Sequence, residues 1–168
     1  METWERQSLL EAHEYVLISC GGDTARFLTH FRGTWKVLPA TVQSVICEYW
    51  RAQGRPPLIE LSDVWSPKTM YGQVRVSGME LRFRADSFKH LPTPAANWII
   101  AHELAHVYQK ASGRVAGGDN ESENEEHANK LAKSWGFDDG VVYLVEFVEA
   151  AHKLTFAEAC KRVEQLRF

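Results

Sequence analysis

The sequence predicts an α+β domain in which helices lie before and after one small antiparallel β-sheet. Two alternating runs in the middle of the chain predict the strands, and helical patterns on both sides of them predict the helices. Helices, then a small sheet, then helices again is an order typical of α+β domains. The length of 168 residues suits a single domain, residues 1–168, with a sizeable hydrophobic core.

The N-terminal third is predicted to be helical. Residues 3–19 have a loosely helical pattern of apolar side chains, and GGDT then breaks it, with Asp23 or Thr24 as the cap of a new helix. The stretch PATVQSVICEYWRAQG predicts a helix of about four turns with one apolar face. Gly54 is expected to end this helix.

The middle of the chain is predicted to form strands. RPPLIELSDV should be extended, because Pro57 disfavours a helix directly before the apolar run LIEL. In MYGQVRVSGMELRFRAD, two alternating runs are joined by Ser77 and Gly78, which predicts a β-hairpin with one face in water. The side chains of the second run that are expected to face the core are Met79, Leu81 and Phe83.

The rest of the chain is predicted to be helical. TPAANWIIAHELAHVYQKASG predicts a long helix with Thr93 as its N-cap, Pro94 in its first turn and Gly113 at its C-terminal end. NESENEEHANKLAKSWGF predicts a second helix, whose acidic first turn suits the positive end of the helix dipole. Residues 138–168 predict one or two further helices.

Composition argues against several classes of function. The net charge of −3 disfavours a broad surface for nucleic acid. The N-terminus carries Glu2 and Glu5 and lacks the apolar run of a signal peptide, and no stretch approaches the roughly 18 apolar residues of a membrane span. We therefore expect a cytoplasmic protein that binds neither nucleic acid nor a membrane. Its three cysteines lack paired spacing and are expected to be free thiols: Cys20, Cys47 and Cys160.

The segment AHELAHVYQ, residues 101–109, carries the candidate chemistry. His102 and His106 are four residues apart, so on a helix both imidazoles point to one side and can bind one zinc ion. Glu103 is rotated by about 100° from His102 around the helix. It can therefore lie beside the metal without binding it and act as a general base. The apolar neighbours predict a core helix, in which unpaired polar groups would be costly and a metal would compensate them.

A catalytic zinc site needs a third protein ligand and one open position. The longer motif H-E-x-x-H-x-x-G-x-x-H fails, because positions 109 and 112 are Gln and Ser. A glutamate on the following helix is the other common solution. Glu125 is the favoured ligand, since Ala128 on the same helix face permits close packing and Asn129 can orient a ligand. The competing carboxylates are Glu121, Glu123 and Glu126.

AHELAH followed by EEHANKLA resembles the gluzincin metallopeptidases, in which H-E-x-x-H is followed by E-x-x-A-N or E-x-x-A-D. The chain is most similar to the ImmA/IrrE type and to minimal, single-domain gluzincins. The resemblance implies that His102, His106 and Glu125 bind zinc. It also implies that Glu103 is the general base and that Asn129 orients one of the zinc ligands without binding the ion itself.

The resemblance covers residues 57–136 and implies a zincin-like core there, with residues 1–55 and 138–168 as helical extensions. The family's small sheet has an edge strand that holds substrate in an extended form, and MELRF would be this strand. Glu121 remains a rival third ligand, since it follows Asn120 as in the N-E pattern of thermolysin-like enzymes.

The residues and the resemblance together imply a zinc metalloendopeptidase, a hydrolase that acts on a peptide or protein substrate. Zinc would polarise the scissile carbonyl, while Glu103 deprotonates the water and then protonates the leaving amine. Two alternatives keep the same scaffold: a catalytically latent, zinc-containing regulatory or binding module, and a phage or toxin–antitoxin regulator whose activity depends on a partner. Four residues are open candidates for stabilising the oxyanion: Tyr71, His127, Tyr143 and His152.

Overall fold

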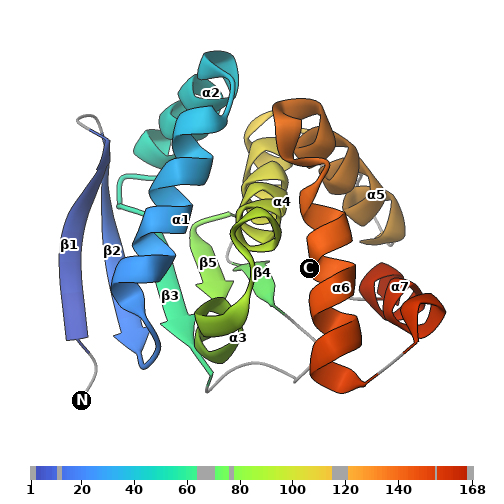
Figure 1. Ribbon diagram of the computed structural model, residues 1–168. Coiled ribbons are helices and arrows are strands. Elements are labelled where there is room, and N and C mark those ends of the chain that lie inside the picture. The colour runs from blue at the N-terminus through green and yellow to red at the C-terminus, as the bar shows by residue number, and fades with distance from the viewer. Residues whose placement is uncertain are drawn as a thin grey trace.

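The computed structural model contains one mixed β-sheet with helices packed on it (Figure 1). The order of the described strands across the sheet is β1-β2-β3-β5-β4. These strands are β1 (Thr3–Leu10), β2 (His13–Cys20), β3 (Leu58–Ser62), β4 (Gly72–Arg75) and β5 (Glu80–Phe83). The residues that the structure describes are 3–10, 13–63, 71–75, 78–114, 121–153 and 155–165.

The centre of the sheet is parallel, so the expectation of an antiparallel sheet is wrong there. β2 pairs with β3, and β3 with β5, in parallel, whereas the outer pairs β1–β2 and β4–β5 are antiparallel. A parallel pair needs a crossover connection. Helices α1 (Thr24–Val37) and α2 (Ala40–Ala52) provide it between β2 and β3. The fold is α+β, with a βαβ crossover in its N-terminal third.

β1 and β2 replace the helix that the pattern of residues 3–19 predicts, so residues 1–55 are not a helical extension. β2 lies between β1 and β3 in the sheet. Tyr15 and Leu17 on β2 are buried in the core, at the two-residue period of a strand. The run EYVLIS has the aromatic and β-branched side chains that suit a strand, but its partner β3 lies far along the chain. A local periodicity cannot reveal such a partner.

The two helices expected after GGDT are confirmed as α1 and α2. Asp23 is the N-cap of α1, and its Oδ1 accepts a hydrogen bond of 2.9 Å from the backbone N–H of Arg26. α2 ends just before Gly54, whose φ of 69° lies in the left-handed region that favours glycine. A stack of Trp35 on Trp50, with ring centroids 5.7 Å apart, joins the two helices.

The predicted hairpin is confirmed as β4 and β5, except that Ser77 of the turn lies outside the described residues. Met79, Leu81 and Phe83 are buried, as expected. The other face of β5 is polar, and Arg82 Nε lies 2.9 Å from Glu60 Oε2 on β3. Because β5 lies between β3 and β4, MELRF is not an edge strand, and that prediction is wrong. Of this hairpin, β4 is the outer strand.

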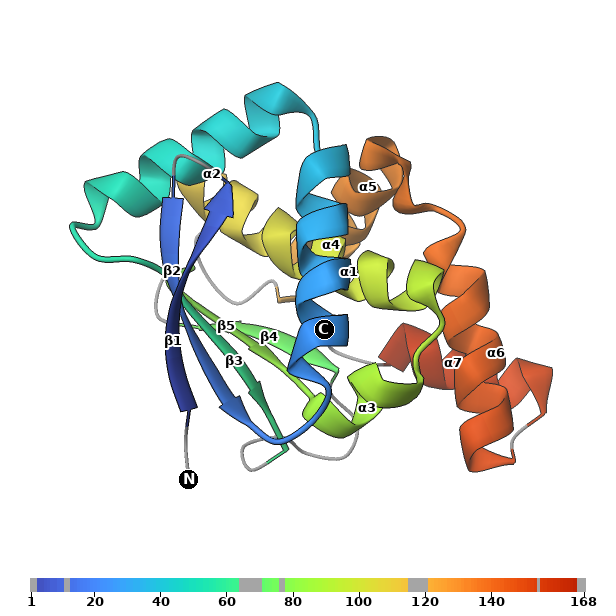
Figure 2. The same cartoon turned by 60° about the vertical axis from the view of Figure 1, so that its left-hand side comes forward.

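α4 (Thr93–Ala111) is the central helix of the molecule, and it packs against α1, α2, β4 and the next two α-helices of the chain (Figure 2). Its N-cap is Pro92, so the helix begins one residue earlier than predicted. A short helix, α3 (Ala85–His90), precedes it and was not predicted. The middle of α4 is buried on all sides: Ile99, Ile100, Ala101, Leu104 and Ala105 are all inaccessible to solvent. A polar side chain there needs a partner.

The helices expected in the last third are confirmed as α5 (Glu121–Ala132), α6 (Gly140–His152) and α7 (Phe156–Gln165). A π-helical turn, η1 (Lys133–Phe137), follows α5, and Gly136 within it has a φ of 93°. This glycine bends the chain so that α5 and α6 both pack on α4. Among the described helices, none is long and apolar enough to cross a membrane.

Candidate metal centre

Two helices bring His102, His106 and Glu125 together. The Nε2 atoms of His102 and His106, one turn apart on α4, are 3.0 Å from each other. Glu125 on α5 places Oε2 3.2 Å from His102 Nε2 and Oε1 3.2 Å from His106 Nε2. Four-coordinate zinc with ligand distances of about 2.0–2.1 Å has neighbouring ligand atoms about 3.3 Å apart. The spacing of these three groups therefore matches the edges of such a site, and the group could hold a metal ion.

Amide oxygens behind the two imidazoles determine which ring nitrogen faces the centre. Asn129 Oδ1 lies 2.9 Å from His102 Nδ1, and Gln109 Oε1 lies 2.9 Å from His106 Nδ1. An amide oxygen only accepts hydrogen bonds, so each Nδ1 carries the proton and donates it. Both Nε2 lone pairs therefore point at Glu125. A convergence of lone pairs and a carboxylate requires a positive charge, and a metal ion supplies one.

The electrostatics of the ligands agree with this requirement. Burial opposes the charge of Glu125, but the close approach of His102 and His106 outweighs it and lowers the pKa of the carboxyl to about 2. Burial lowers the pKa of His102, which favours the neutral ligand form. Burial also acts to lower the pKa of His106, but Glu125 and Glu103 outweigh it and raise that pKa.

Glu103 lies on another side of α4, toward β4. Its carboxylate is fully buried, and neither oxygen has a hydrogen-bond partner among the described residues. Burial raises the pKa of Glu103 to about 8. A Cβ atom at Gly72 of β4 would lie only 2.6 Å from Glu103 Oε1, so only glycine leaves room for the carboxylate there. A buried carboxyl without a partner fits a group that has a bound water or substrate to act on.

Gln109 is a site residue that sequence reasoning missed. It is 2% exposed, and its side-chain Nε2 donates to the backbone oxygen of Asn124 at 2.8 Å and to His127 Nδ1 at 3.0 Å. In the sequence, Gln109 stood out only because it breaks the motif H-E-x-x-H-x-x-G-x-x-H, which has glycine at this position. The available signal was its i+3 spacing from His106, which places both side chains on one helix face.

Of the three competing glutamates, Glu123 and Glu126 lie away from the centre. Glu126 is exposed and forms an ion pair with Lys130, 2.6 Å away, on the surface of α5. Glu123 is exposed as well. The side chain of Glu121 lies outside the described part of the chain. Ala128, next to the ligand turn, is fully buried, as expected for a helix that packs closely on α4.

The four oxyanion candidates are placed very differently. His127 is bound by Gln109, on the side of His106 that faces away from the Nε2 cluster. His152 is exposed near the end of α6, where burial and Arg162 lower its pKa. Tyr71 directly precedes Gly72, is buried, and has a pKa raised mainly by burial. Of the four, Tyr71 is thus next in sequence to the strand residue that touches Glu103.

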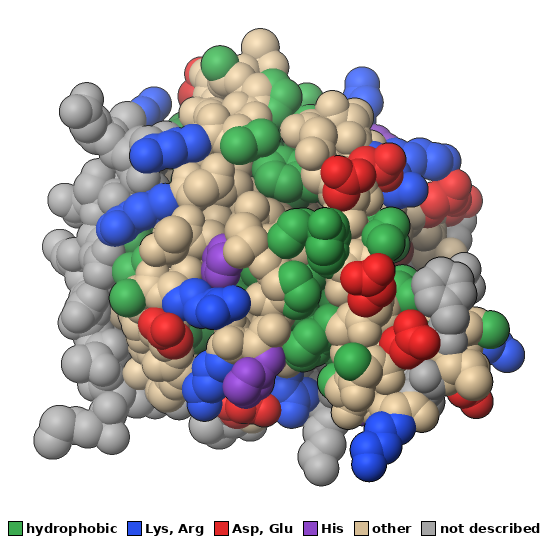
Figure 3. Space-filling model, viewed as in Figure 1, with side chains coloured by type: hydrophobic (Ala, Val, Ile, Leu, Met, Phe, Trp, Pro, Cys, Tyr) green, Lys and Arg blue, Asp and Glu red, His purple; other side chains and the backbone are tan. Residues whose placement is uncertain are grey.

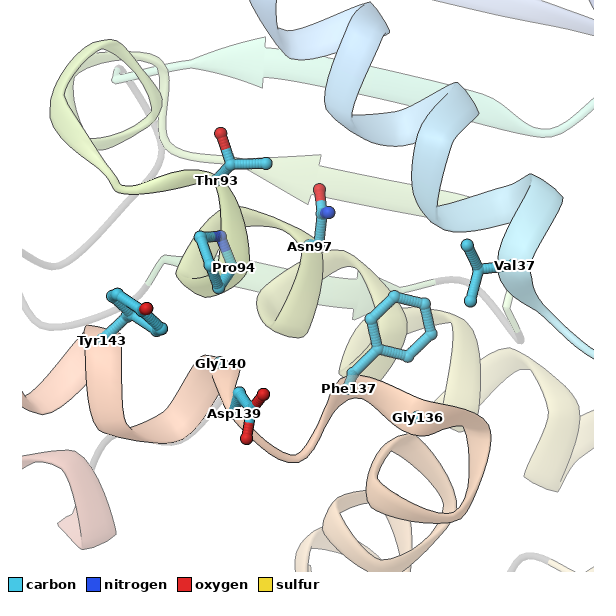
Figure 4. A pocket seen from close by; sticks show the side chains of 9 residues that line it. All are labelled: Val37, Thr93, Pro94, Asn97, Gly136, Phe137, Asp139, Gly140 and Tyr143. Carbon is cyan, nitrogen blue, oxygen red and sulfur yellow. The ribbon is translucent and has the colours of Figure 1, made fainter.

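Tyr143 instead lines a cavity of about 380 Å³ between the first turns of α4 and α6 (Figure 4). On the face of the molecule shown in Figure 3, hydrophobic side chains gather near the middle of the view. Val37 and Tyr143, which line the cavity, are exposed, at 58% and 42%. None of the three metal-binding candidates lines this cavity. Its lining consists of Val37, Thr93, Pro94, Asn97, Gly136, Phe137, Asp139, Gly140 and Tyr143.

Within the described ranges, His102, His106 and Glu125 form the one cluster of histidine, cysteine and carboxylate side chains spaced to hold an ion. Comparison of the chain with protein-family models, with curated proteins and with solved structures finds no match.

Proposed function

We propose that the protein is a zinc-dependent metallopeptidase of the gluzincin type, which hydrolyses a peptide bond in a peptide or protein substrate. One observation carries the proposal: the two imidazoles of the His102–His106–Glu125 cluster lie on the same helix as Glu103, a buried glutamate with no hydrogen-bond partner among the described residues. A structural metal site has no use for such a glutamate, whereas hydrolysis requires a base beside the metal.

The donor set favours zinc over other common ions. Neutral imidazole and carboxylate ligands in a compact, three-residue arrangement are typical of catalytic zinc, which keeps a further position for water or substrate. Calcium and magnesium prefer oxygen ligands only. His106 and Glu125 are the partly exposed members of the cluster, at 12% and 24% of their side chains, so the open position is reached past them.

Each protein group then has a defined task. A zinc ion held by His102, His106 and Glu125 would polarise the scissile carbonyl and lower the pKa of water. Glu103 would take a proton from the attacking water and pass it to the leaving amine. Burial raises the pKa of Glu103 to about 8, and a cation bound beside it would lower this pKa toward the ionised form that a base needs. Asn129 and Gln109 hold the imidazoles with Nε2 toward the ion.

An extended substrate has a natural place along β4. Among the described strands, β4 has β5 as its only neighbour, and Gly72 of β4 touches Glu103. A peptide added to this edge would pass the base at close range, with main-chain hydrogen bonds providing affinity. We therefore assign the pairing with an extended substrate, first predicted for MELRF, to the adjacent strand β4.

Elemental analysis with a cleavage assay tests the proposal. Purified protein should contain about one zinc per chain, and it should cleave an unfolded protein. Glu103→Gln should keep the zinc and the fold but abolish cleavage, because an amide cannot accept the proton. Wild-type protein without bound zinc, or an undiminished Glu103→Gln enzyme, would refute the proposal.

A second candidate is a catalytically latent zinc module. The observation that favours it is the complete burial of both His102 and Glu103, which limits the access of water to the base. It predicts the same zinc content, with no cleavage by wild-type protein and no difference between wild type and Glu103→Gln in any partner-binding assay. Activity that appears only with a partner would point to a regulated enzyme.

A further inference from the structure

We propose that Gln109 is a positioning residue that fixes the His106 ring and links the two ligand-bearing helices through a single amide. This inference rests on the proposed zinc site and adds to it a residue outside the H-E-x-x-H and E-x-x-A-N motifs. Gln109 makes three hydrogen bonds in the space between α4 and α5, and it is almost fully buried there.

The oxygen of the amide acts on a metal ligand. Gln109 Oε1 accepts a hydrogen bond of 2.9 Å from His106 Nδ1. An imidazole that donates from Nδ1 has its lone pair on Nε2, the atom that faces His102 and Glu125. Gln109 therefore does for His106 what Asn129 does for His102. The two imidazoles are supported from different helices, His102 from α5 and His106 from its own helix α4.

The nitrogen of the same amide acts on the other ligand helix. Gln109 Nε2 donates at 2.8 Å to the backbone oxygen of Asn124, the residue directly before Glu125. A shift of α5 along α4 would break this bond and at the same time move the Glu125 carboxylate away from both Nε2 atoms. Gln109 thus couples the orientation of His106 to the position of Glu125.

His127 completes the network as an acceptor. Its Nδ1 lies 3.0 Å from Gln109 Nε2, so Nδ1 carries the lone pair and Nε2 the proton. The bond keeps the Gln109 amide in the orientation that offers its oxygen, and not its nitrogen, to His106. It also holds His127 behind His106, so we assign His127 to this network and not to the oxyanion.

Three substitutions separate these tasks. Gln109→Met keeps the volume and removes all three bonds. Gln109→Glu keeps an acceptor for His106 and removes both donors. His127→Phe removes only the outer acceptor. Loss of a supporting residue behind a metal-bound histidine typically costs about 10- to 100-fold in metal affinity. We expect Gln109→Met to lose this much zinc affinity in chelator competition, Gln109→Glu to retain at least a tenth of the wild-type affinity, and His127→Phe to stay within about threefold.

Nitrogen-15 spectra of the His106 ring provide a readout that packing alone would not move. In zinc-loaded wild type, His106 should show a protonated Nδ1 and a metal-bound Nε2, and Gln109→Glu should retain this pattern. Gln109→Met should shift the Nδ1 signal or broaden it. The wild-type spectrum needs no variant, so the inference stays testable even if Gln109→Met does not fold.

The outcomes distinguish this inference from the proposed function. Wild type that holds no zinc contradicts the proposed function itself. Zinc-loaded wild type with the metal on His106 Nδ1, or a folded Gln109→Met with wild-type affinity and spectrum, overturns the role of Gln109 and leaves the zinc site standing. A folded Gln109→Glu as weak as Gln109→Met would also overturn it, because the acceptor for His106 would then not matter.

Discussion

At the scale of single residues, the centre depends on which carboxylate completes it. Glu125 contacts both imidazoles, whereas Glu126, its neighbour in sequence, points to solvent and pairs with Lys130. Glu125→Ala should lose zinc to a chelator that wild type resists, since a ligand is gone. Glu126→Ala is the matched control and should keep zinc, because it removes only an exposed i,i+4 pair, which contributes little to stability.

Glu121 is the remaining rival from the sequence, and the same chelator assay decides it. Glu121→Ala should behave like Glu126→Ala, at a cost of about 0.3–1 kcal/mol from the helix dipole. If Glu121→Ala lost zinc while Glu125→Ala retained it, the third ligand would lie one turn earlier on α5. The E-x-x-A-N pattern would then no longer describe the site.

Glu103 should make the free energy of unfolding depend on pH in protein from which metal has been removed. Because burial raises its pKa from 4.5 to about 8, the folded state binds a proton that the unfolded chain has released. The free energy of unfolding should therefore fall as the pH rises from about 4.5 to 8, by up to about 1.4 kcal/mol per pH unit. Glu103→Gln cannot ionise and should lack this contribution.

Urea unfolding of both metal-free proteins at several pH values measures the effect. The stability of Glu103→Gln relative to wild type should increase with pH across this window. Other titrating groups are shared by the two proteins and cancel in the difference, except for His106, whose pKa Glu103 helps to raise. Parallel stability curves would mean that Glu103 is solvated in the folded protein, against its complete burial.

At the residue scale, some residues of the candidate metal site could be predicted from the sequence and others could not. The i,i+4 spacing of His102 and His106 is a local property of a helix, so it could be read from the sequence, as could the Glu125–Asn129 pair on α5. Gln109 could not be assigned in the same way. Its partners His127 and the Asn124 backbone belong to another helix, and only the packing of α5 on α4 selects them.

At the scale of elements, long periodic segments were predicted correctly and distant pairings were not. α2, α4 and α5 follow from apolar periodicity, caps and glycine, which act within one segment. β2 depends on its parallel partner β3, and the place of β5 inside the sheet depends on β3 and β4 together. Such pairings are decided by the whole fold and cannot be read from a local pattern. For this reason the sequence predicted a helix where β1 and β2 lie, and an edge strand at MELRF, which lies inside the sheet.

The edge strand β4 gives a testable prediction about the substrate. Arg84 N donates to Tyr71 O, and in antiparallel pairing the alternation then directs the N–H groups of Gly72 and Val74 away from β5. Val74→Pro removes one outward N–H without breaking a bond to β5. A hydrogen bond worth about 0.5–1.5 kcal/mol corresponds to roughly a 2- to 12-fold weaker substrate affinity.

Val74→Ala is the control for this prediction, because it loses the side chain and keeps the N–H. We expect a higher KM for Val74→Pro than for Val74→Ala, with zinc content unchanged in both. Equal KM values for the two variants would show that substrate docks elsewhere than on β4.

At the scale of the whole molecule, a zinc ion would link α5 to the central helix α4 through ligands from both. The ligands come from both helices, and α4 also touches β4 through Glu103. Binding to the folded state alone at 100 times Kd stabilises it by about 2.7 kcal/mol. For a chain of this length, about 2–4 °C per kcal/mol then predicts a rise in Tm of about 5–10 °C.

The stabilisation should be local as well as global, because the ion acts where the two helices meet. Amide hydrogen exchange in α5 should slow on addition of zinc, while exchange in β1 and β2, at the far side of the sheet, should change less (Figure 1). His106→Ala lacks one ligand and should show neither the rise in Tm nor the slower exchange in α5. If His106→Ala responded to zinc as wild type does, the ion would bind outside this cluster. The rise in Tm would then not result from a zinc ion that links α4 and α5.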